Sequence, residues 1–343
     1  MTSLGRNLLR RLARRVRRGM IPEAVILMYH RVDDVELDPW GLAVSPRHFD
    51  HHLQVLRERS RPLSLAGMLN ARQRGRLPRR SVVVTFDDGY ADNLYHAAPL
   101  LMRHQIPATV FVTVGGTGSE REFWWDELAH LFLRPGRLPS RLELEINGAA
   151  QHWELGEASD YRTDDYPRDR DRRPWEAAPN SRLAFYYSVW KALRPLPYAE
   201  REQALGTLRH WAETAPRAPS YRPLSEAELR VLSDGGLVEI GGHTLTHPSL
   251  PAHPPALQRI EIHECKARLE HMLQRPITSF AYPFGDYVPA TAELVRDAGY
   301  ICACTTAAAR VKRTSDPFEL PRFEVRNWSR DEFDGRLRGW LRD

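Results

Sequence analysis

The chain has 343 residues, of which 42% are hydrophobic and 27% charged, so we expect a globular, enzyme-sized protein with a sizeable core. A net charge of only +5, with no Walker loop, no Cys/His finger spacing and no aromatic-plus-basic RNA motif, gives no reason to expect nucleic acid as a partner. Three cysteines argue against a disulfide framework and fit a reducing compartment.

Residues 1–20 form a basic segment in which apolar side chains recur every four positions between arginines: Leu4, Leu8, Leu12 and Val16. As a helix it presents one apolar and one cationic face, which suits either peripheral contact with an anionic membrane or a docked or disordered tail. The apolar run that follows is short and has an early Pro and Glu, so we expect a strand and no secretion signal. No segment is long enough to span a bilayer. These features predict a cytoplasmic protein that can lie at the inner face of the membrane.

From residue 21 onward, apolar runs alternate with helical patterns. The runs "AVILMYH", "SVVVTFDDG" and "ATVFVTVGG" are separated by helical stretches at residues 45–59 and 91–105. Continuously apolar strands are typical of a sheet that is buried on both faces. The β-α-β-α-β order predicts a parallel sheet or barrel, and the same alternation resumes after residue 223.

Residues 118–223 interrupt this alternation and are interpreted as a mostly helical insertion. They contain an amphipathic helix, a hairpin that turns at Asn147–Gly148, a charge-rich linker, and helices at about 180–195 and 198–214. The insertion either covers the site and shapes substrate choice or only packs on the main fold. Nothing in its sequence identifies a ligand.

Polar residues gather where the predicted strands end. They are His30, then Asp87 with Asp88, then His243 with His247, and finally Tyr282 to Gly285. Because active-site residues of parallel α/β barrels gather at the carboxyl ends of the strands, we expect these groups to share one mouth.

Two imidazoles and one carboxylate form a facial ligand set that leaves positions open for water and substrate, as in catalytic zinc sites. A His-x3-His pair alone is weak evidence, but here it accompanies two aspartates after a buried strand. One aspartate can bind the cation, while the other accepts a proton from a water that the metal activates. A structural alternative is that Asp88 only caps the next helix.

Two other groups of metal-ligating residue types are interpreted as structural. His48, His51 and His52 crowd one predicted helix and fit a solvated polar face better than a metal site. Cys302 and Cys304 lie in "YICACTT", which is typical of a buried strand.

The motifs "TFDDGY", "HTLTHPSL" and "FAYPFG" resemble those of the polysaccharide deacetylase family, the NodB-homology domains of carbohydrate esterase family 4. The resemblance covers roughly residues 22–117 and 224–325. It implies an α/β fold, a distorted (β/α) barrel, that removes N-acetyl groups from GlcNAc-type sugars with one divalent metal ion. Zinc is expected first, with cobalt, nickel or manganese as alternatives.

The resemblance also implies roles for individual residues. Asp87 would be the general base, Asp88, His243 and His247 would bind the metal, and the Phe284 amide, in the segment that starts at Tyr282, would stabilise the oxyanion.

The sequence departs from the best-known family pattern at two points. Ala281 stands where the pattern has an Arg that braces the catalytic Asp, and no late L-x-H motif supplies the usual general acid. The motif "LMYHRV" is similar to the exopolysaccharide branch of the family, so His30 becomes the candidate acid. Arg322 in "LPRFEV" is the candidate brace. The alternatives are a structural strand-end histidine and an ordinary salt bridge.

The sequence therefore predicts a metal-dependent N-deacetylase of an N-acetylhexosamine-containing glycan or glycan precursor. One alternative is a hydrolase of another amide, a cyclic imide or an O-acetyl ester on the same fold. Another is a catalytically silent glycan-binding module.

Overall fold

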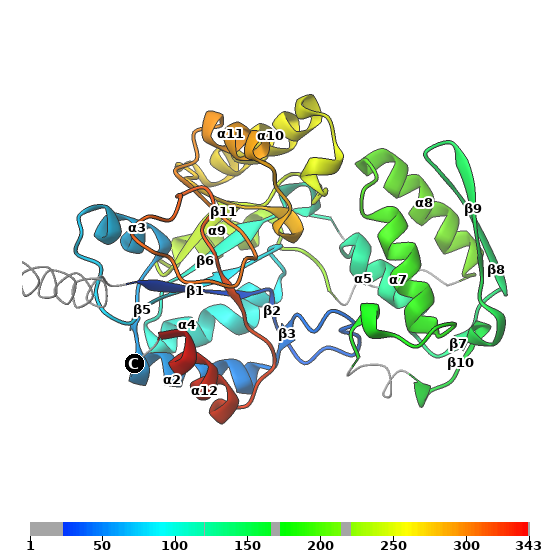
Figure 1. Ribbon diagram of the computed structural model, residues 1–343, viewed down its shortest axis with the longest axis horizontal. Coiled ribbons are helices and arrows are strands. Elements are labelled where there is room, and N and C mark those ends of the chain that lie inside the picture. The colour runs from blue at the N-terminus through cyan, green and yellow to red at the C-terminus, as the bar shows by residue number, and fades with distance from the viewer. Residues whose placement is uncertain (1–22, 120, 166–171, 214–220, 342–343) are drawn as a thin grey trace, which may run out of the picture.

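The computed structural model describes residues 23–119, 121–165, 172–213 and 221–341, and Figure 1 shows a barrel lobe with a second lobe beside it. Within these ranges, no helix is both long and apolar enough to cross a membrane. The predicted amphipathic segment at residues 1–20 lies outside the described residues.

The barrel lobe is built on one curled, all-parallel sheet, as the alternating pattern predicts. In spatial order its strands are β13 (Cys302–Cys304), β12 (Ser279–Ala281), β11 (Val238–Gly242), β6 (Ala108–Val112), β5 (Ser81–Phe86), β1 (Ala24–Tyr29) and β14 (Phe323–Glu324), with β4 (Arg61–Pro62) also paired to β5. The central strands β1, β5 and β6 are buried along their whole length, because helices cover the sheet. The distorted (β/α) barrel is therefore confirmed.

Helices surround this sheet (Figure 1). They are α2 (Pro46–Arg59), α3 (Leu65–Gln73), α4 (Ala98–His104), α9 (Glu226–Asp234), α10 (Pro255–Leu273), α11 (Pro289–Asp297) and α12 (Arg330–Leu341). Ser45 caps α2 by accepting the N–H of His48, and Ser225 forms a capping box with Glu228 at α9. Helices α3 and α12 were not predicted from the sequence, and α4 is preceded by a π-helical turn, η1 (Asn93–Ala97).

The second lobe consists of elements from the predicted insertion. They are α5 (Trp124–Phe132), β7 (Gly136–Arg137), β8 (Arg141–Ile146), β9 (Ala149–Glu154), β10 (Asp160–Tyr161), the 3₁₀ turn η4 (Pro174–Glu176), α7 (Arg182–Leu193) and α8 (Tyr198–Trp211). The predicted hairpin is confirmed as the antiparallel pair β8–β9. The lobe has its own hydrophobic cluster, with Phe132, Tyr186 and Leu205 fully buried.

Contacts next to the carboxyl end of the sheet join the two lobes. The long loop between β2 (Arg31–Val32) and β3 (Ala43–Val44) reaches across to the second lobe, where Trp40 donates a hydrogen bond to Tyr186 over 2.8 Å. Arg194 at the end of α7 forms an ion pair with Asp286 of the barrel. The insertion therefore lies against the end of the barrel where the predicted site residues gather.

Candidate active site

The structure brings the three predicted metal-binding residues together. Asp88 follows β5, while His243 and His247 follow β11. Asp88 Oδ1 lies 3.5 Å from Nε2 of His243 and 3.4 Å from Nε2 of His247. One ligand atom from each residue lies within 4.8 Å of the other two, and all three side chains are buried. Residues from two strands that are not neighbours in sequence thus form one compact donor set.

The backbone around this donor set adopts left-handed conformations that most residues avoid. Asp88 has φ 73°, Thr244 has φ 68°, His247 has φ 56° and Phe284 has φ 59°. Each non-glycine residue in this region costs on the order of 1–3 kcal/mol, so the surrounding packing must hold it there. Such strained positions cluster at functional sites.

The loop between the two histidines is held from three sides. Glu261 on α10 accepts the N–H groups of Leu245 and Thr246 at 2.8 and 2.9 Å and the Thr246 hydroxyl at 2.6 Å. From the insertion, Arg201 donates to the Thr246 carbonyl at 2.7 Å. Gly115 donates its N–H to the Leu245 carbonyl at 2.7 Å, and a Cβ on Gly115 would lie only 2.3 Å from that oxygen. No local signal in the sequence points to this support, because Glu261 lies in an ordinary helical pattern.

The protonation states of these residues fit a divalent cation. His243 Nδ1 lies 2.7 Å from the Ala281 carbonyl, which can only accept, so Nδ1 carries the hydrogen and Nε2 is left free as a ligand. Burial lowers the pKa of His247 to about 4, which keeps that imidazole neutral at neutral pH. Burial raises the pKa of Asp88, but the adjacent rings of His243 and His247 outweigh it and hold the pKa well below the usual range. Neutral imidazole and ionised carboxylate are the forms of these side chains that bind a metal.

Beside this donor set, Asp87 forms a buried, bidentate ion pair with Arg322. The guanidinium donates to Asp87 Oδ1 at 2.6 Å and to Oδ2 at 2.7 Å, and Arg322 is fully buried. Arg322 also donates to the Thr305 carbonyl at 3.0 Å and to the Thr85 hydroxyl at 3.2 Å. Burial raises the pKa of Asp87, but the charge of Arg322 outweighs it, so the pKa is lowered and Asp87 is ionised at neutral pH. This contact is the one predicted for Arg322 as the bracing arginine.

The sequence matches the polysaccharide deacetylase family over residues 74–134 and 206–303, and these two ranges contain the metal donors and Asp87. The chain contains a polysaccharide deacetylase domain.

Two curated relatives match parts of this chain. The polysaccharide deacetylase homologue YxkH of Bacillus subtilis is 26% identical over 39% of this chain and 48% of its own length. Poly-beta-1,6-N-acetyl-D-glucosamine N-deacetylase of Staphylococcus aureus is 33% identical over 23% of this chain and 27% of its own length. The chain therefore spans about half of the first relative and about a quarter of the second.

Solved structures share the fold over nearly the whole chain. The deacetylase PplD of Streptococcus pyogenes, in complex with acetate, has a TM-score of 0.58 at 18% identity and covers 94% of this chain and 99% of its own. IcaB from Ammonifex degensii has a TM-score of 0.57 at 20% identity and covers 94% and 98%. These likenesses show that the fold of the deacetylase domain extends beyond the sequence match.

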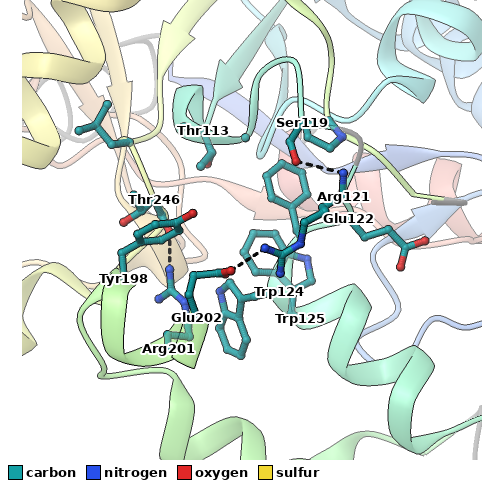
Figure 2. A pocket seen from close by; sticks show the side chains of 15 residues that line it. Thr113, Ser119, Arg121, Glu122, Trp124, Trp125, Tyr198, Arg201, Glu202 and Thr246 are labelled. Atoms are coloured by element: carbon teal, nitrogen blue, oxygen red, sulfur yellow. Dashed lines mark hydrogen bonds and ion pairs between the residues drawn. The ribbon is translucent and has the colours of Figure 1, made fainter. Parts of the chain in front are cut away.

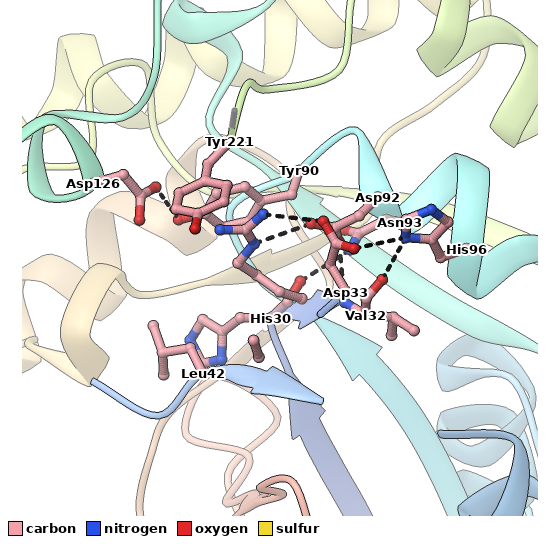
Figure 3. A network of polar contacts seen from close by, with 12 residues as sticks. His30, Val32, Asp33, Leu42, Tyr90, Asp92, Asn93, His96, Asp126 and Tyr221 are labelled. Atoms are coloured by element: carbon pink, nitrogen blue, oxygen red, sulfur yellow. Dashed lines mark hydrogen bonds and ion pairs between the residues drawn. The ribbon is translucent and has the colours of Figure 1, made fainter. Parts of the chain in front are cut away.

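His30 is half-buried beside the two aspartates of the deacetylase domain. The carbonyl of the preceding residue, Tyr29, accepts the N–H of Asp87 at 3.0 Å, so His30 follows its strand next to the aspartate pair. The His30 carbonyl accepts a hydrogen bond from the Asn93 side chain at 2.9 Å (Figure 3). The position is compatible with a proton donor, and the role itself stays a prediction.

Tyr282 and Phe284 differ in how the structure uses their side chains. Tyr282 is fully buried, donates its hydroxyl to the Phe318 carbonyl at 3.0 Å and stacks on Tyr287, so its ring belongs to the core. The Phe284 ring packs edge-on against the metal donor His247, with 4.5 Å between ring centroids. Phe284 thus lies at the site, and the oxyanion role of its amide stays a prediction.

The insertion contributes an acidic group at the edge of the site that the sequence did not reveal (Figure 3). Asp126 on α5 accepts a hydrogen bond of 2.6 Å from the hydroxyl of Tyr90, which in turn accepts one of 2.7 Å from Trp125. Arg31 lies over the rings of Tyr90 and Tyr221, 4.5 and 4.0 Å from their centroids. Burial raises the pKa of Asp126 to about 8, so it is largely protonated at neutral pH. This network fixes the insertion next to the aspartate motif.

A hollow that is partly open to solvent lies between the insertion and the histidine loop (Figure 2). Its lining includes Trp125, Arg201 and Thr246, but none of the three metal donors. The Trp125 ring lies 4.5 Å from that of His247, so it stands at the border between the hollow and the metal donors. The hollow is therefore a neighbour of the active site and not its centre.

Proposed function

We propose that this protein is a metal-dependent hydrolase that removes the N-acetyl group from an N-acetylhexosamine in a glycan or glycan precursor and releases acetate. The observation that carries the proposal is the ionised Asp87, fixed by Arg322 directly beside the Asp88–His243–His247 donor set. The deacetylase domain and the substrate named for the Staphylococcus aureus relative support the choice of an N-acetylated sugar.

Asp88, His243 and His247 would hold one divalent cation through one oxygen and two nitrogen atoms, a set that suits zinc and also cobalt, nickel or manganese. When bound, such an ion supplies a Lewis acid for the acetyl carbonyl and lowers the pKa of a nearby water.

The chain's own groups would then carry the proton transfers. Asp87 accepts a proton from the attacking water, and Arg322 keeps its carboxylate ionised and oriented toward the site. The Phe284 N–H donates to the oxyanion that forms on the acetyl carbonyl. His30 donates a proton to the sugar nitrogen as the C–N bond breaks. The products are acetate and the protonated amine, and the proton that Asp87 accepted returns to His30 through solvent.

The test replaces donors and base separately. Asp88→Ala and His243→Ala should lose both bound metal and acetate release. Asp87→Asn should keep the bound metal, but its rate of acetate release should fall more than about a hundredfold. Metal content would be measured on each variant protein. Acetate release would be measured with UDP-GlcNAc, lipid-linked sugars and GlcNAc oligomers as substrates, with Zn, Co, Ni or Mn added. Full activity of the Asp88 variant would refute the mechanism, and acetate release from O-acetyl esters alone would refute the N-deacetylase.

A further inference from the structure

A row of aromatic rings leads from the surface of the insertion to the metal donor His247. We define the aromatic row as Trp175, Trp40, Tyr187, Trp190 and Phe284. Trp175 is 50% exposed, Trp40, Tyr187 and Phe284 are half-buried, and Trp190 is buried. A half-exposed tryptophan next to three other accessible rings is an apolar surface that water does not favour.

Successive rings of the row are in contact. The centroid of Trp40 lies 6.0 Å from that of Trp175 and 4.5 Å from that of Trp190. The Trp190 centroid lies 5.8 Å from that of Phe284, which lies 4.5 Å from the His247 ring. Tyr187 flanks the middle of the row, 6.1 Å from both Trp40 and Trp190. The row is therefore continuous with the active site.

Polar contacts fix the row in place. The indole N–H of Trp40 is bonded to Tyr186, and Arg173 donates to the Trp40 carbonyl at 2.9 Å. Figure 1 shows the β2–β3 loop that carries Trp40 reaching to the insertion. The Arg194 guanidinium lies over the Phe284 ring, 4.4 Å from its centroid. These contacts hold the rings before any ligand arrives, which lowers the entropic cost of binding.

The chemistry of the row matches a sugar chain better than a protein or lipid. The C–H faces of a hexosamine ring are apolar and flat enough to pack on an aromatic face, while its hydroxyl and acetamido groups stay at the edge, in water. Charged groups border the row: Lys191 lies over the Tyr187 ring at 4.8 Å. Four of the five rings, Phe284 excepted, lie outside residues 74–134 and 206–303, so the row belongs to this chain's loop and insertion and not to the matched family ranges.

We propose that the accessible rings of the aromatic row, with the buried Trp190 packed behind them, are a binding platform on which successive sugar rings of an N-acetylhexosamine oligomer or polymer stack on their way to the active site. The identity of the sugar rests on the proposed function. The platform implies that the substrate is a chain of several sugars and not a nucleotide-linked monosaccharide, because a single sugar at the metal donors would reach only the Phe284 end of the row.

The test compares short and long β-1,6-linked GlcNAc oligomers. Trp175→Ala should raise KM for the hexamer roughly tenfold with little change in kcat and should leave the dimer unaffected. Tyr187→Ala is a second variant with the same expectation. Tyr198→Ala is the matched control, since Tyr198 is a 52% exposed aromatic residue of the same insertion outside the row. An unchanged hexamer KM in both row variants, or an equal loss in the control, would overturn the platform.

A calorimetric titration of the hexamer into EDTA-treated protein separates this inference from the proposed function, since it needs no turnover. Trp175-dependent hexamer binding without acetate release from any glycan would keep the platform and reject the deacetylase. Acetate release combined with hexamer binding that does not depend on Trp175 would keep the deacetylase and reject the platform. If binding of lipid vesicles depends on Trp175 and binding of the hexamer does not, the platform is rejected and the row is a lipid-binding surface.

Discussion

Replacing Arg322 by methionine tests the buried ion pair at the centre of the site. Methionine keeps the apolar stem but removes the two hydrogen bonds of 2.6 and 2.7 Å to Asp87. Because both side chains are at most 4% exposed, the carboxylate would be left buried without a counter-charge. Breaking a buried pair in this way costs about 3–5 kcal/mol, so we expect the free energy of unfolding to fall by this amount at neutral pH.

The loss should depend on pH in a definite direction. In the native protein the pKa of Asp87 is lowered, so ionised Asp87 stabilises the fold above its ordinary pKa of about 3.9, and this contribution disappears as the pH falls through the folded-state value. In the variant, burial dominates and raises the pKa of Asp87. The ionised carboxylate then destabilises the folded variant at neutral pH, and protonation of Asp87 removes this cost. The stability difference should therefore be largest near pH 7 and shrink steadily as the pH falls toward about 4.

The assay is urea unfolding of both proteins in EDTA at about pH 7 and pH 5. The double variant Asp87→Asn/Arg322→Met is the control, because it removes both charges and should lose less stability than the two single variants combined. A loss below about 1 kcal/mol at pH 7, or an equal loss at both pH values, would contradict the reasoning.

Two further predictions concern residues outside the reaction itself. Glu261→Gln should weaken zinc binding about 10–100-fold in a competition titration, because one amide oxygen cannot replace the carboxylate that holds the histidine loop, whereas Glu264→Gln on the exposed side of α10 should have no effect. Burial raises the pKa of Cys265 and Cys304 to about 12, so a thiol reagent should label the cysteines only after denaturation. Rapid labelling of the native protein would show that the barrel opens.

The sequence by itself determined the elements whose signals are local. Continuously apolar runs predicted β1, β5 and β6, because burial of a strand on both faces leaves a signal in neighbouring residues. The four-residue spacing of His243 and His247 and the aspartate pair after a strand indicated a metal site, and the resemblance to the deacetylase family assigned Asp88 to it. Parallel strands necessarily bring their carboxyl ends to one edge.

Only the tertiary structure decided the contacts between distant segments. Arg322 and Asp87 are 235 residues apart, and no local pattern specifies that the two meet as a bidentate pair. Other contacts likewise depend on how the insertion lies on the barrel: that of Trp125 with His247, that of Arg201 with the histidine loop, and that of Trp40 with Trp190. That placement results from many long-range side-chain contacts, so the surroundings of the predicted site emerge only when the two lobes are seen packed together.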